Sequence, residues 1–454
     1  MLTCNLLNAE AAKEILRRGV SISGEEKILS FLRFMARGSP NGRLPHLREL
    51  SIYPDHYGLS LFTASLLAHL LRCMAHLGRL TTLNIGGIER LLASHPALVP
   101  TLAHFSIKHL TVGQVGILGQ RLLAAMRSQL TTVRVDFLSN DIRFSNRNDE
   151  VCPDANPMWL LLHSQHSLHE LWISASTSAP NGPRYPNMAS LSLITSDTPR
   201  ISHYIHAFPN LKTLYTDIEK DWEEDSNPQR LLNQREQELY GTWTRLESYD
   251  GDTCTLYYLG LKCPINSIKV LDTENQCDPS MLKALLVDAR PRDLWLRIQS
   301  TDLVFDDVFI EALTQESSQH LRKFYLSILL LRCDMREEVD LDDVLDAVVT
   351  DILAALPLLI IFKIRILCDH LAIGLDADVD IDPMRPLEEQ LARWDIRAFA
   401  NRAFKASSSG NLRKVVISVT GHRTRRVYKT AFLRADVVET TDSSDDGGED
   451  SDDE

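Results

Sequence analysis

The sequence predicts an α/β fold: a curved solenoid of irregular leucine-rich repeats, with short parallel strands on its concave face and helices behind them. Three observations support this prediction. A short apolar phrase recurs along the chain, helical patterns fill the intervals between its copies, and the chain ends in an acidic stretch that is typical of a disordered tail.

The recurring phrase places an apolar residue, two variable residues, a second apolar residue, one variable residue and a third apolar residue in order. Its clear copies are LRELSI from Leu47, LTTLNI from Leu80, LAHFSI from Leu102, LTTVRV from Leu130, LHELWI from Leu168, MASLSL from Met188, LKTLYT from Leu211, INSIKV from Ile265, PRDLWL from Pro291, LRKFYL from Leu321 and LRKVVI from Leu412. Poorer copies lie at Leu246–Gly251 and near Leu358, and the mean interval is about 30 residues. Each copy predicts a strand whose three apolar side chains point inward and stack on the next repeat.

Helices are predicted between these strands, because apolar residues recur there at three- and four-residue spacing. The clearest segments are Ser60–Leu77, Gly116–Leu130, Met281–Arg290 and Leu341–Leu356. A single strand–helix unit cannot bury its apolar side, so neighbouring units must stack. The alternative is an ordinary α/β domain whose strands share an apolar triplet.

One position departs from the standard leucine-rich motif, which has Asn or Cys eight residues after the first Leu. Here that position is Asp55, Ile88, Leu110, Leu138, Ser176, Ser196 or Glu219. We therefore expect uneven loops and an irregular arc.

The chain has 454 residues, of which 44% are hydrophobic, and a formal net charge of −13. We expect a helical N-terminal cap (1–43), the solenoid (44–420), a basic segment (421–435) and a disordered acidic tail (436–454). The tail holds ten carboxylates and no Lys or Arg. The remainder is thus nearly neutral, which argues against specific nucleic-acid binding.

Two features of this end of the chain have open interpretations. Ser443 and Ser451 each precede an acidic residue by three positions, which suits an acid-directed kinase. The basic run HRTRR (His422–Arg426) is either a nuclear-import signal or a neutralising partner for the tail.

The distribution of cysteines and of apolar runs indicates the cellular compartment. The eight cysteines form no CxxC pair, which favours a reducing compartment. The first residues lack a long apolar run, and the longest such run, Ile352–Phe362, is too short to span a bilayer. We expect a cytoplasmic or nuclear protein that does not bind a membrane.

Motifs for catalysis or metal binding are weak. The sequence contains no GxGxxG, GxxxxGK or GxSxG pattern. The run Asp376–Asp382 begins like a calcium loop but has Ile381 at the glycine position and Leu387 at the glutamate position. Five spaced histidines lack HExxH or cysteine partners: His163, His166, His169, His203 and His206. We expect no enzyme activity, cofactor or metal.

The strand phrase also predicts which side chains face solvent. The central outward residues are Ser51, Asn84, Ser106, Arg134, Trp172, Ser192, Tyr215, Lys269, Trp295 and Tyr325. Aromatic and arginine side chains are enriched in binding hot spots. We therefore predict a protein-binding site centred on four aromatic residues and bordered by charged ones: Trp172, Tyr215, Trp295, Tyr325, Arg134, Asp136, Asp217, Arg297 and Lys323. The alternative is that these rings pack against loops or against one another.

The opening LLNAEAAKEILRRGVSISGEEKILSFLRFM and the following RLPHLRELSI resemble the F-box and leucine-rich-repeat proteins of mushroom-forming fungi. The resemblance implies that an F-box docks on the Skp adaptor of a cullin ubiquitin ligase while the repeats hold the substrate. The F-box itself is not recognisable, because Leu44-Pro45 already opens the first repeat and residues 1–43 lack tryptophan. The expected function is a protein-interaction module acting as a ligase substrate receptor. The alternatives are an adaptor without an F-box, or a nuclear, acidic-tailed scaffold that binds histones.

Overall fold

The computed structural model describes residues 2–36, 40–55, 58–77, 79–138, 156–174, 178–195, 199–218, 227–271, 278–299, 301–330, 340–368, 386–407, 410–420, 428–433 and 438–440. The chain divides into two compact units, Met1–Glu223 and Glu224–Glu454, which we call unit 1 and unit 2. Each unit is described by itself.

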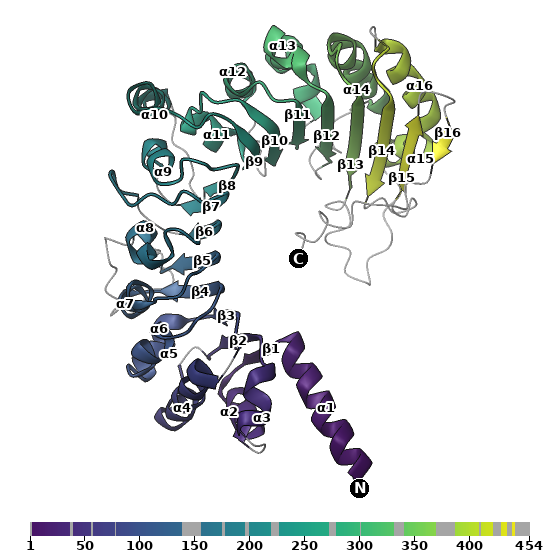
Figure 1. The fold of residues 1–454 in the computed structure, drawn as a ribbon. Coiled ribbons are helices and arrows are strands. Elements are labelled where there is room, and N and C mark those ends of the chain that lie inside the picture. Colours follow the sequence, from purple (N-terminus) through teal and green to yellow (C-terminus); the bar gives the residue numbers. More distant parts are fainter. Residues whose placement is uncertain are drawn as a thin grey trace. The chain divides into compact units, whose positions relative to one another are not determined.

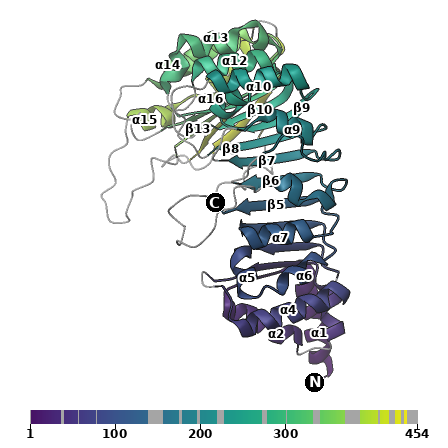
Figure 2. The ribbon, with the colours of Figure 1, turned by 90° about the vertical axis from the view of Figure 1, so that its left-hand side faces the viewer.

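Unit 1 is a stack of strand–helix repeats. Its strands are β1 (Val20–Ser23), β2 (Glu49–Tyr53), β3 (Thr82–Ile85), β4 (His109–Val115), β5 (Thr132–Phe137), β6 (Glu170–Ser174), β7 (Ser190–Thr195) and β8 (Thr213–Ile218). Each strand pairs in parallel with the next strand along the chain. Figure 2 shows β5 to β8 side by side.

Most helices of unit 1 pack behind this strand layer, whereas the N-terminal helix extends from the end of the stack (Figure 1). The helices of this unit are α1 (Leu2–Arg18), α2 (Glu25–Ala36), α3 (Pro40–Arg43), α4 (Leu61–Leu77), α5 (Ile88–Ser94), α6 (Leu98–Ala103), α7 (Ile117–Ala125), α8 (Pro157–Leu160) and α9 (Ile201–Ala207). The apolar residues of the phrase align in register and are buried, as in the ladder Leu50, Leu83, Leu110, Val133, Leu171, Leu191 and Leu214. This ladder is the core of the unit, as the phrase predicts.

Unit 2 repeats the same architecture. Its parallel strands are β9 (Leu246–Gly251), β10 (Ile265–Leu271), β11 (Asp293–Ile298), β12 (Lys323–Leu329), β13 (Ile361–Leu367) and β14 (Lys414–Thr420). The buried ladder is Tyr249, Ile268, Leu294, Phe324, Phe362 and Val415. The α/β solenoid fold class predicted from the sequence is therefore confirmed.

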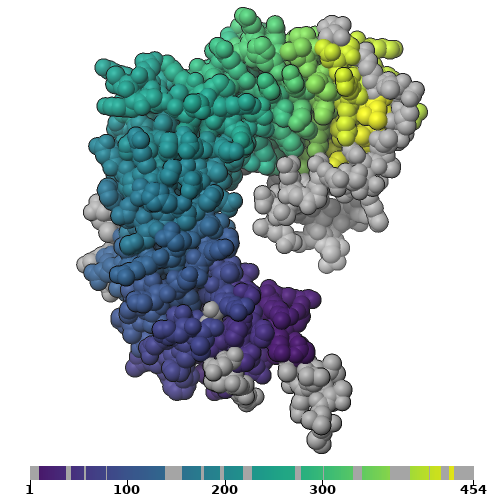
Figure 3. Space-filling view, viewed as in Figure 1, coloured from purple at the N-terminus to yellow at the C-terminus, as the bar shows by residue number. Residues whose placement is uncertain are grey.

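The helices of unit 2 are α10 (Asn227–Tyr240), α11 (Thr253–Leu259), α12 (Pro279–Ala289), α13 (Asp307–Thr314), α14 (Leu341–Ala347), α15 (Pro386–Arg393) and α16 (Ile396–Ala406). A π-helical turn, Val348–Ile352, continues α14. In the space-filling view of Figure 3, the atoms of successive repeats abut along each unit. Within the described residues, no helix is long and apolar enough to cross a membrane.

The structure differs from the predicted element boundaries in three places. The phrase at Leu102 covers the end of α6 and a loop, because the strand follows at His109–Val115 and Thr111 takes the outward position expected for Ser106. Residues 1–43 contain a sheet strand, β1, as well as helices. The copy near Leu358 begins one residue later, with Phe362 and Ile364 buried.

The sheet also continues past the expected end of the solenoid at 420. Strand β15 (Tyr428–Leu433) pairs antiparallel with β14, and β16 (Val438–Thr440) pairs antiparallel with β15. The first lies in the expected basic segment and the second in the expected disordered tail. Hairpin-like pairing at a sheet edge covers backbone groups that β14 would otherwise expose.

Serine and threonine hydroxyls make loop hydrogen bonds of the kind expected from the Asn or Cys of the standard leucine-rich motif, which this chain lacks. The buried Ser128 hydroxyl donates to the Phe105 carbonyl at 2.5 Å, and the buried Ser164 hydroxyl donates to the Ser128 carbonyl at 2.9 Å. The Thr81 and Thr131 hydroxyls donate to the carbonyls of Arg48 and Lys108 at 3.0 and 3.1 Å. Each bond joins one repeat to the preceding one and satisfies a loop carbonyl.

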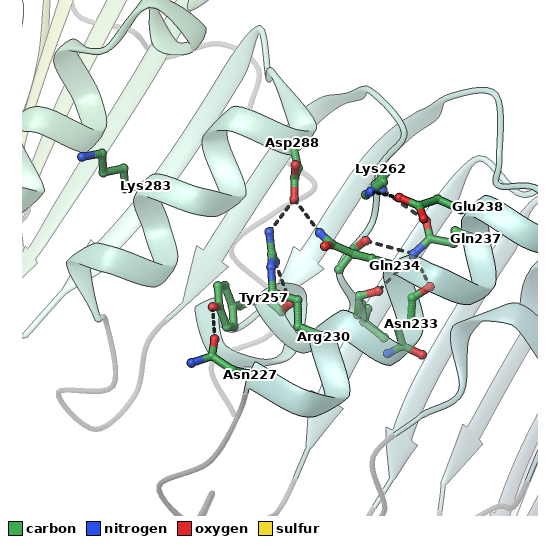
Figure 4. A network of polar contacts seen from close by, with 12 residues as sticks. Asn227, Arg230, Asn233, Gln234, Gln237, Glu238, Tyr257, Lys262, Lys283 and Asp288 are labelled. Atoms are coloured by element: carbon green, nitrogen blue, oxygen red, sulfur yellow. Dashed lines mark hydrogen bonds and ion pairs between the residues drawn. The ribbon is translucent and has the colours of Figure 1, made fainter.

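The first helix of unit 2 is held by polar contacts (Figure 4). The Gln237 amide donates to the Gly260 carbonyl at 2.9 Å and accepts from the Lys262 N–H at 3.2 Å. Arg230 donates to the Tyr257 carbonyl at 2.8 Å and forms an ion pair with Asp288 on α12. Helix α10 is thus anchored by buried amides, whereas Leu231 and Tyr240 are exposed.

Candidate functional site

The candidate site is the side of the strand layer that points away from the helices, which we call the strand face. In unit 2 the register places one side chain from each strand in a central row: Asp250, Lys269, Trp295, Tyr325, Lys363 and Val416. Because side chains alternate along a strand, this row lies opposite the buried ladder.

Trp295, Tyr325 and Lys363 form a cluster on β11, β12 and β13, which we call the aromatic cluster. The two rings stack with centroids 3.9 Å apart and an interplanar angle of 22°. The Lys363 ammonium lies 5.3 Å from the Trp295 centroid and 5.5 Å from the Tyr325 centroid, within cation–π range. All three side chains are partly exposed. A partner can therefore contact a preorganised aromatic surface.

The strand face around this cluster is basic. Strands β11 to β15 carry one carboxylate, Asp293, and six cationic side chains: Arg297, Lys323, Lys363, Arg365, Lys414 and Lys429. Lys323 donates to Asp293 at 2.8 Å, and this hydrogen bond raises the pKa of the lysine. At the edge of this region, Lys269 forms an ion pair with Asp250 at 3.1 Å. The surface offers cations and aromatic rings together.

Arg297 lies one row beyond the aromatic cluster, beside Ser327. Its Nε atom is buried and has no hydrogen-bond partner among the residues that the structure describes. Buried donors are normally satisfied by protein, water or ligand. The place of Arg297 at the border of a binding surface stays a prediction.

The strand face of unit 1 has a different character. Its central row is Ser21, Ser51, Asn84, Thr111, Arg134, Trp172, Ser192 and Tyr215. The Arg134 guanidinium lies 4.0 Å from the Trp172 ring centroid. Asp136 accepts a hydrogen bond from the Ser174 hydroxyl. Among the described residues, the strand face of unit 1 thus offers the Arg134–Trp172 cation–π pair and mainly small polar residues around it.

The predicted site residues fall into separate groups. The structure brings Trp295 next to Tyr325 and Arg134 next to Trp172, whereas Ser192 on β7 lies between Trp172 and Tyr215. Asp217 is exposed near the end of β8. The first aromatic pair belongs to unit 2, and Trp172 and Tyr215 belong to unit 1. A single site centred on all four rings stays a prediction.

Lys363 is not among the predicted site residues, because the copy of the phrase near Leu358 had no exact start. The alternation IFKIRIL is the signal that locates this lysine on the outward side of β13. Several predicted features lie outside the described residues: Asp376–Asp382, His422–Arg426, Ser443 and Ser451.

A cavity of about 690 Å³ lies on the helix side of unit 2. Its walls come from α14, α15 and α16 and include Asp346, Glu389, Trp394 and Arg402. An ion pair joins Arg402 to Asp346. Within the described residues, no group of three or more His, Cys, Asp or Glu side chains is placed to hold a metal ion. The described lining of the cavity carries charges of both signs.

No family model matches the chain, and no curated protein matches it. A crystal structure of a Bacteroides fragilis protein, determined by a structural genomics consortium, is similar at 15% identity with a TM-score of 0.25. The match covers 58% of this chain and 68% of that one. A likeness at this level carries no argument about function.

Proposed function

We propose that this protein is a protein-interaction solenoid whose strand faces bind a partner. The observation that carries this proposal is the aromatic cluster of unit 2: two stacked, partly exposed rings beside a lysine on a rigid sheet. Aromatic rings bury large area at low entropic cost, and a sheet holds them in place before binding. The Arg134–Trp172 pair is the corresponding feature of unit 1.

The resemblance to fungal F-box and leucine-rich-repeat proteins suggests one version of this role, the substrate receptor of a Skp–cullin ligase. An adaptor without an F-box is the second version. It is supported by β1, because this strand joins residues of the expected N-terminal cap to the solenoid sheet. A histone-binding scaffold is the third version, supported by the ten carboxylates of residues 436–454. We place the protein in the cytoplasm or nucleus in all three versions.

Affinity purification of the full chain from its native cells tests the proposal. We expect the double substitution Trp295→Ala, Tyr325→Ala to remove the captured partners. Tyr240→Ala is the matched control, because Tyr240 is 77% exposed on helix α10 rather than on the strand face. Retention of every partner by the double variant contradicts the proposal for unit 2. Trp172→Ala tests unit 1 in the same way.

The identity of the captured proteins separates the three versions. Skp adaptor and cullin in the eluate support the ligase receptor. Other partners without those two proteins support the adaptor. Histones that are lost when residues 436–454 are removed support the scaffold.

A further inference from the structure

The strand face of unit 2 has a charge opposite to that of the sequence that follows it. Six cations and one carboxylate lie on β11 to β15. Three exposed arginines, Arg292, Arg322 and Arg413, directly precede β11, β12 and β14 and extend the positive charge along one edge. By contrast, the helices of the same unit carry both signs, for example Asp342, Asp346, Arg397 and Lys405. The strand side of β11 to β15 therefore has an excess of cations over carboxylates, whereas the helix side mixes both signs.

The chain continues from this sheet into an acidic segment, residues 441–454. The segment contains eight carboxylates and no Lys or Arg. It begins directly after β16, which pairs with β15 at the edge of the same sheet. The acidic segment is therefore tethered beside a surface of opposite charge within one unit.

The tether is long enough to cover this surface. Neighbouring strands lie about 4.8 Å apart, so the five steps from β16 to β11 span roughly 24 Å. Fourteen extended residues reach at most roughly 46 Å at about 3.3 Å per residue. The acidic segment can thus reach the aromatic cluster and all six cations.

We propose that the acidic segment binds the strand face of β11 to β15 in cis, and that the ligand chemistry of this face is an acidic peptide. The segment then occupies the surface on which a partner binds, so the inference rests on the proposed function. A partner with its own acidic stretch displaces the segment. Tethering through a short stretch of chain gives an effective concentration on the order of millimolar, so even a weak contact is populated.

Zero-length carbodiimide cross-linking of the full chain, followed by peptide mapping, tests this contact directly. The reagent joins carboxylates to nearby amines. We expect carboxylates of residues 442–454 to link mainly to Lys323, Lys363, Lys414 and Lys429. These links should be found in the monomeric fraction, and their yields should fall at high salt. Lys283 and Lys405, on helices α12 and α16, are the internal controls. Equal linkage to the helix lysines overturns the proposal.

A binding measurement supplies the second test. The probe is a fluorescent peptide with the sequence of residues 441–454. We expect the chain truncated after Thr440 to bind this peptide about tenfold more tightly than the full chain, since the tethered copy competes. Equal affinity of the two chains, or no binding to the truncated chain, contradicts the proposal.

Charge reversal locates the peptide site. In the truncated chain, Lys363→Glu with Arg365→Glu should weaken peptide binding at least tenfold. The matched control, Arg397→Glu with Lys405→Glu, makes the same charge change on α16 and should leave the affinity within twofold. Equal losses overturn the assignment to the strand face. Thermal melting of each variant verifies folding, and the cross-linking test needs no substitution.

Three further outcomes discriminate between explanations. A single-stranded oligonucleotide that binds the truncated chain more tightly than the peptide would identify a nucleic-acid surface and overturn the peptide assignment. If Trp295→Ala with Tyr325→Ala removes partners but the acidic segment does not cross-link to the strand face, this inference fails and the proposed function stands. If the segment cross-links as expected but the double variant keeps every partner, the inference stands and the proposed function fails for unit 2.

Discussion

The indole ring of Trp295 stacks on the phenol ring of Tyr325 across the adjacent strands β11 and β12, with 3.9 Å between centroids. Both rings are partly exposed on the side of the sheet opposite the buried ladder. Trp243, in contrast, is 1% exposed. The same residue type therefore occupies two environments in unit 2, and substitutions at the two positions should have different consequences.

Trp295→Ala should lower the free energy of unfolding by about 1 kcal/mol, because an aromatic pair contributes about 0.5 to 1.5 kcal/mol beyond the area it buries. Trp243→Ala should lower it by about 3 to 5 kcal/mol, because it leaves a cavity in the core. Denaturant unfolding of both variants measures the difference. A similar loss at the two positions would mean that Trp295 is a core residue, which would favour the alternative that the rings stabilise the fold.

Gln237→Leu should destabilise unit 2 by about 2 to 3 kcal/mol. The substitution leaves the Gly260 carbonyl and the Lys262 N–H without their present partner, and each buried unsatisfied group costs about 1 to 3 kcal/mol. Leu239→Ala, on the same helix at 67% exposure, is the control and should change stability by less than about 0.5 kcal/mol. Equal effects would show that α10 is not anchored by its amides.

The strand phrase predicted the fold because it encodes burial directly. At Leu50, Leu83 and Leu294 the second apolar position of the phrase is a buried strand residue. The copy at Leu102 failed for a physical reason: Phe105 and Ile107 are also buried, but they lie in the loop that follows α6. The spacing of apolar residues reports burial and does not by itself distinguish a strand from a packed loop.

The candidate site was only partly predictable. Trp295 and Tyr325 followed from the alternation within their strands, and their stacking requires the register, which no single strand encodes. Asn233 and Gln237 are buried although they are polar, so the spacing of apolar residues did not predict their burial. Strand β15 was not predicted, because its residues lie in a segment that stands out by its basic charge. The alternation of buried Phe432 with exposed Leu433 is consistent with a strand there. Side-chain contacts between neighbouring repeats depend on the register of their strands, which the local pattern of one strand does not contain.

Acid should weaken the link between the first repeats. The side-chain hydrogen bonds from Ser60 and then Thr63 lower the pKa of Glu25, which holds the start of α4. A carboxylate whose pKa is lower in the folded state stabilises the fold above its unfolded pKa, about 4.3, and that stabilisation is lost as pH falls through the folded value.

Glu25→Gln tests this link. The substitution should lower the free energy of unfolding by about 1 kcal/mol at neutral pH, because a hydrogen bond to a charged acceptor contributes about that much more than one to a neutral acceptor, and the difference from the unsubstituted chain should shrink as pH falls below about 4. Unfolding curves at several pH values measure it. A difference that stays constant down to pH 3 would show that the charge of Glu25 does not contribute.

Thiol reactivity should separate two cysteines of known environment. Burial raises the pKa of Cys263 to about 11, and its side chain is 1% exposed. Cys73 is partly exposed on α4. Because the thiolate is the reactive form, an alkylating reagent at pH 8 should label Cys73 in the folded chain and leave Cys263 unlabelled. Raising the pH to 9.5 should still not label Cys263, whereas denaturant should, as peptide mapping would show. Rapid labelling of Cys263 at pH 8 without denaturant would mean that the start of unit 2 opens locally, and that the buried contacts around β9 and β10 are weaker than their geometry indicates.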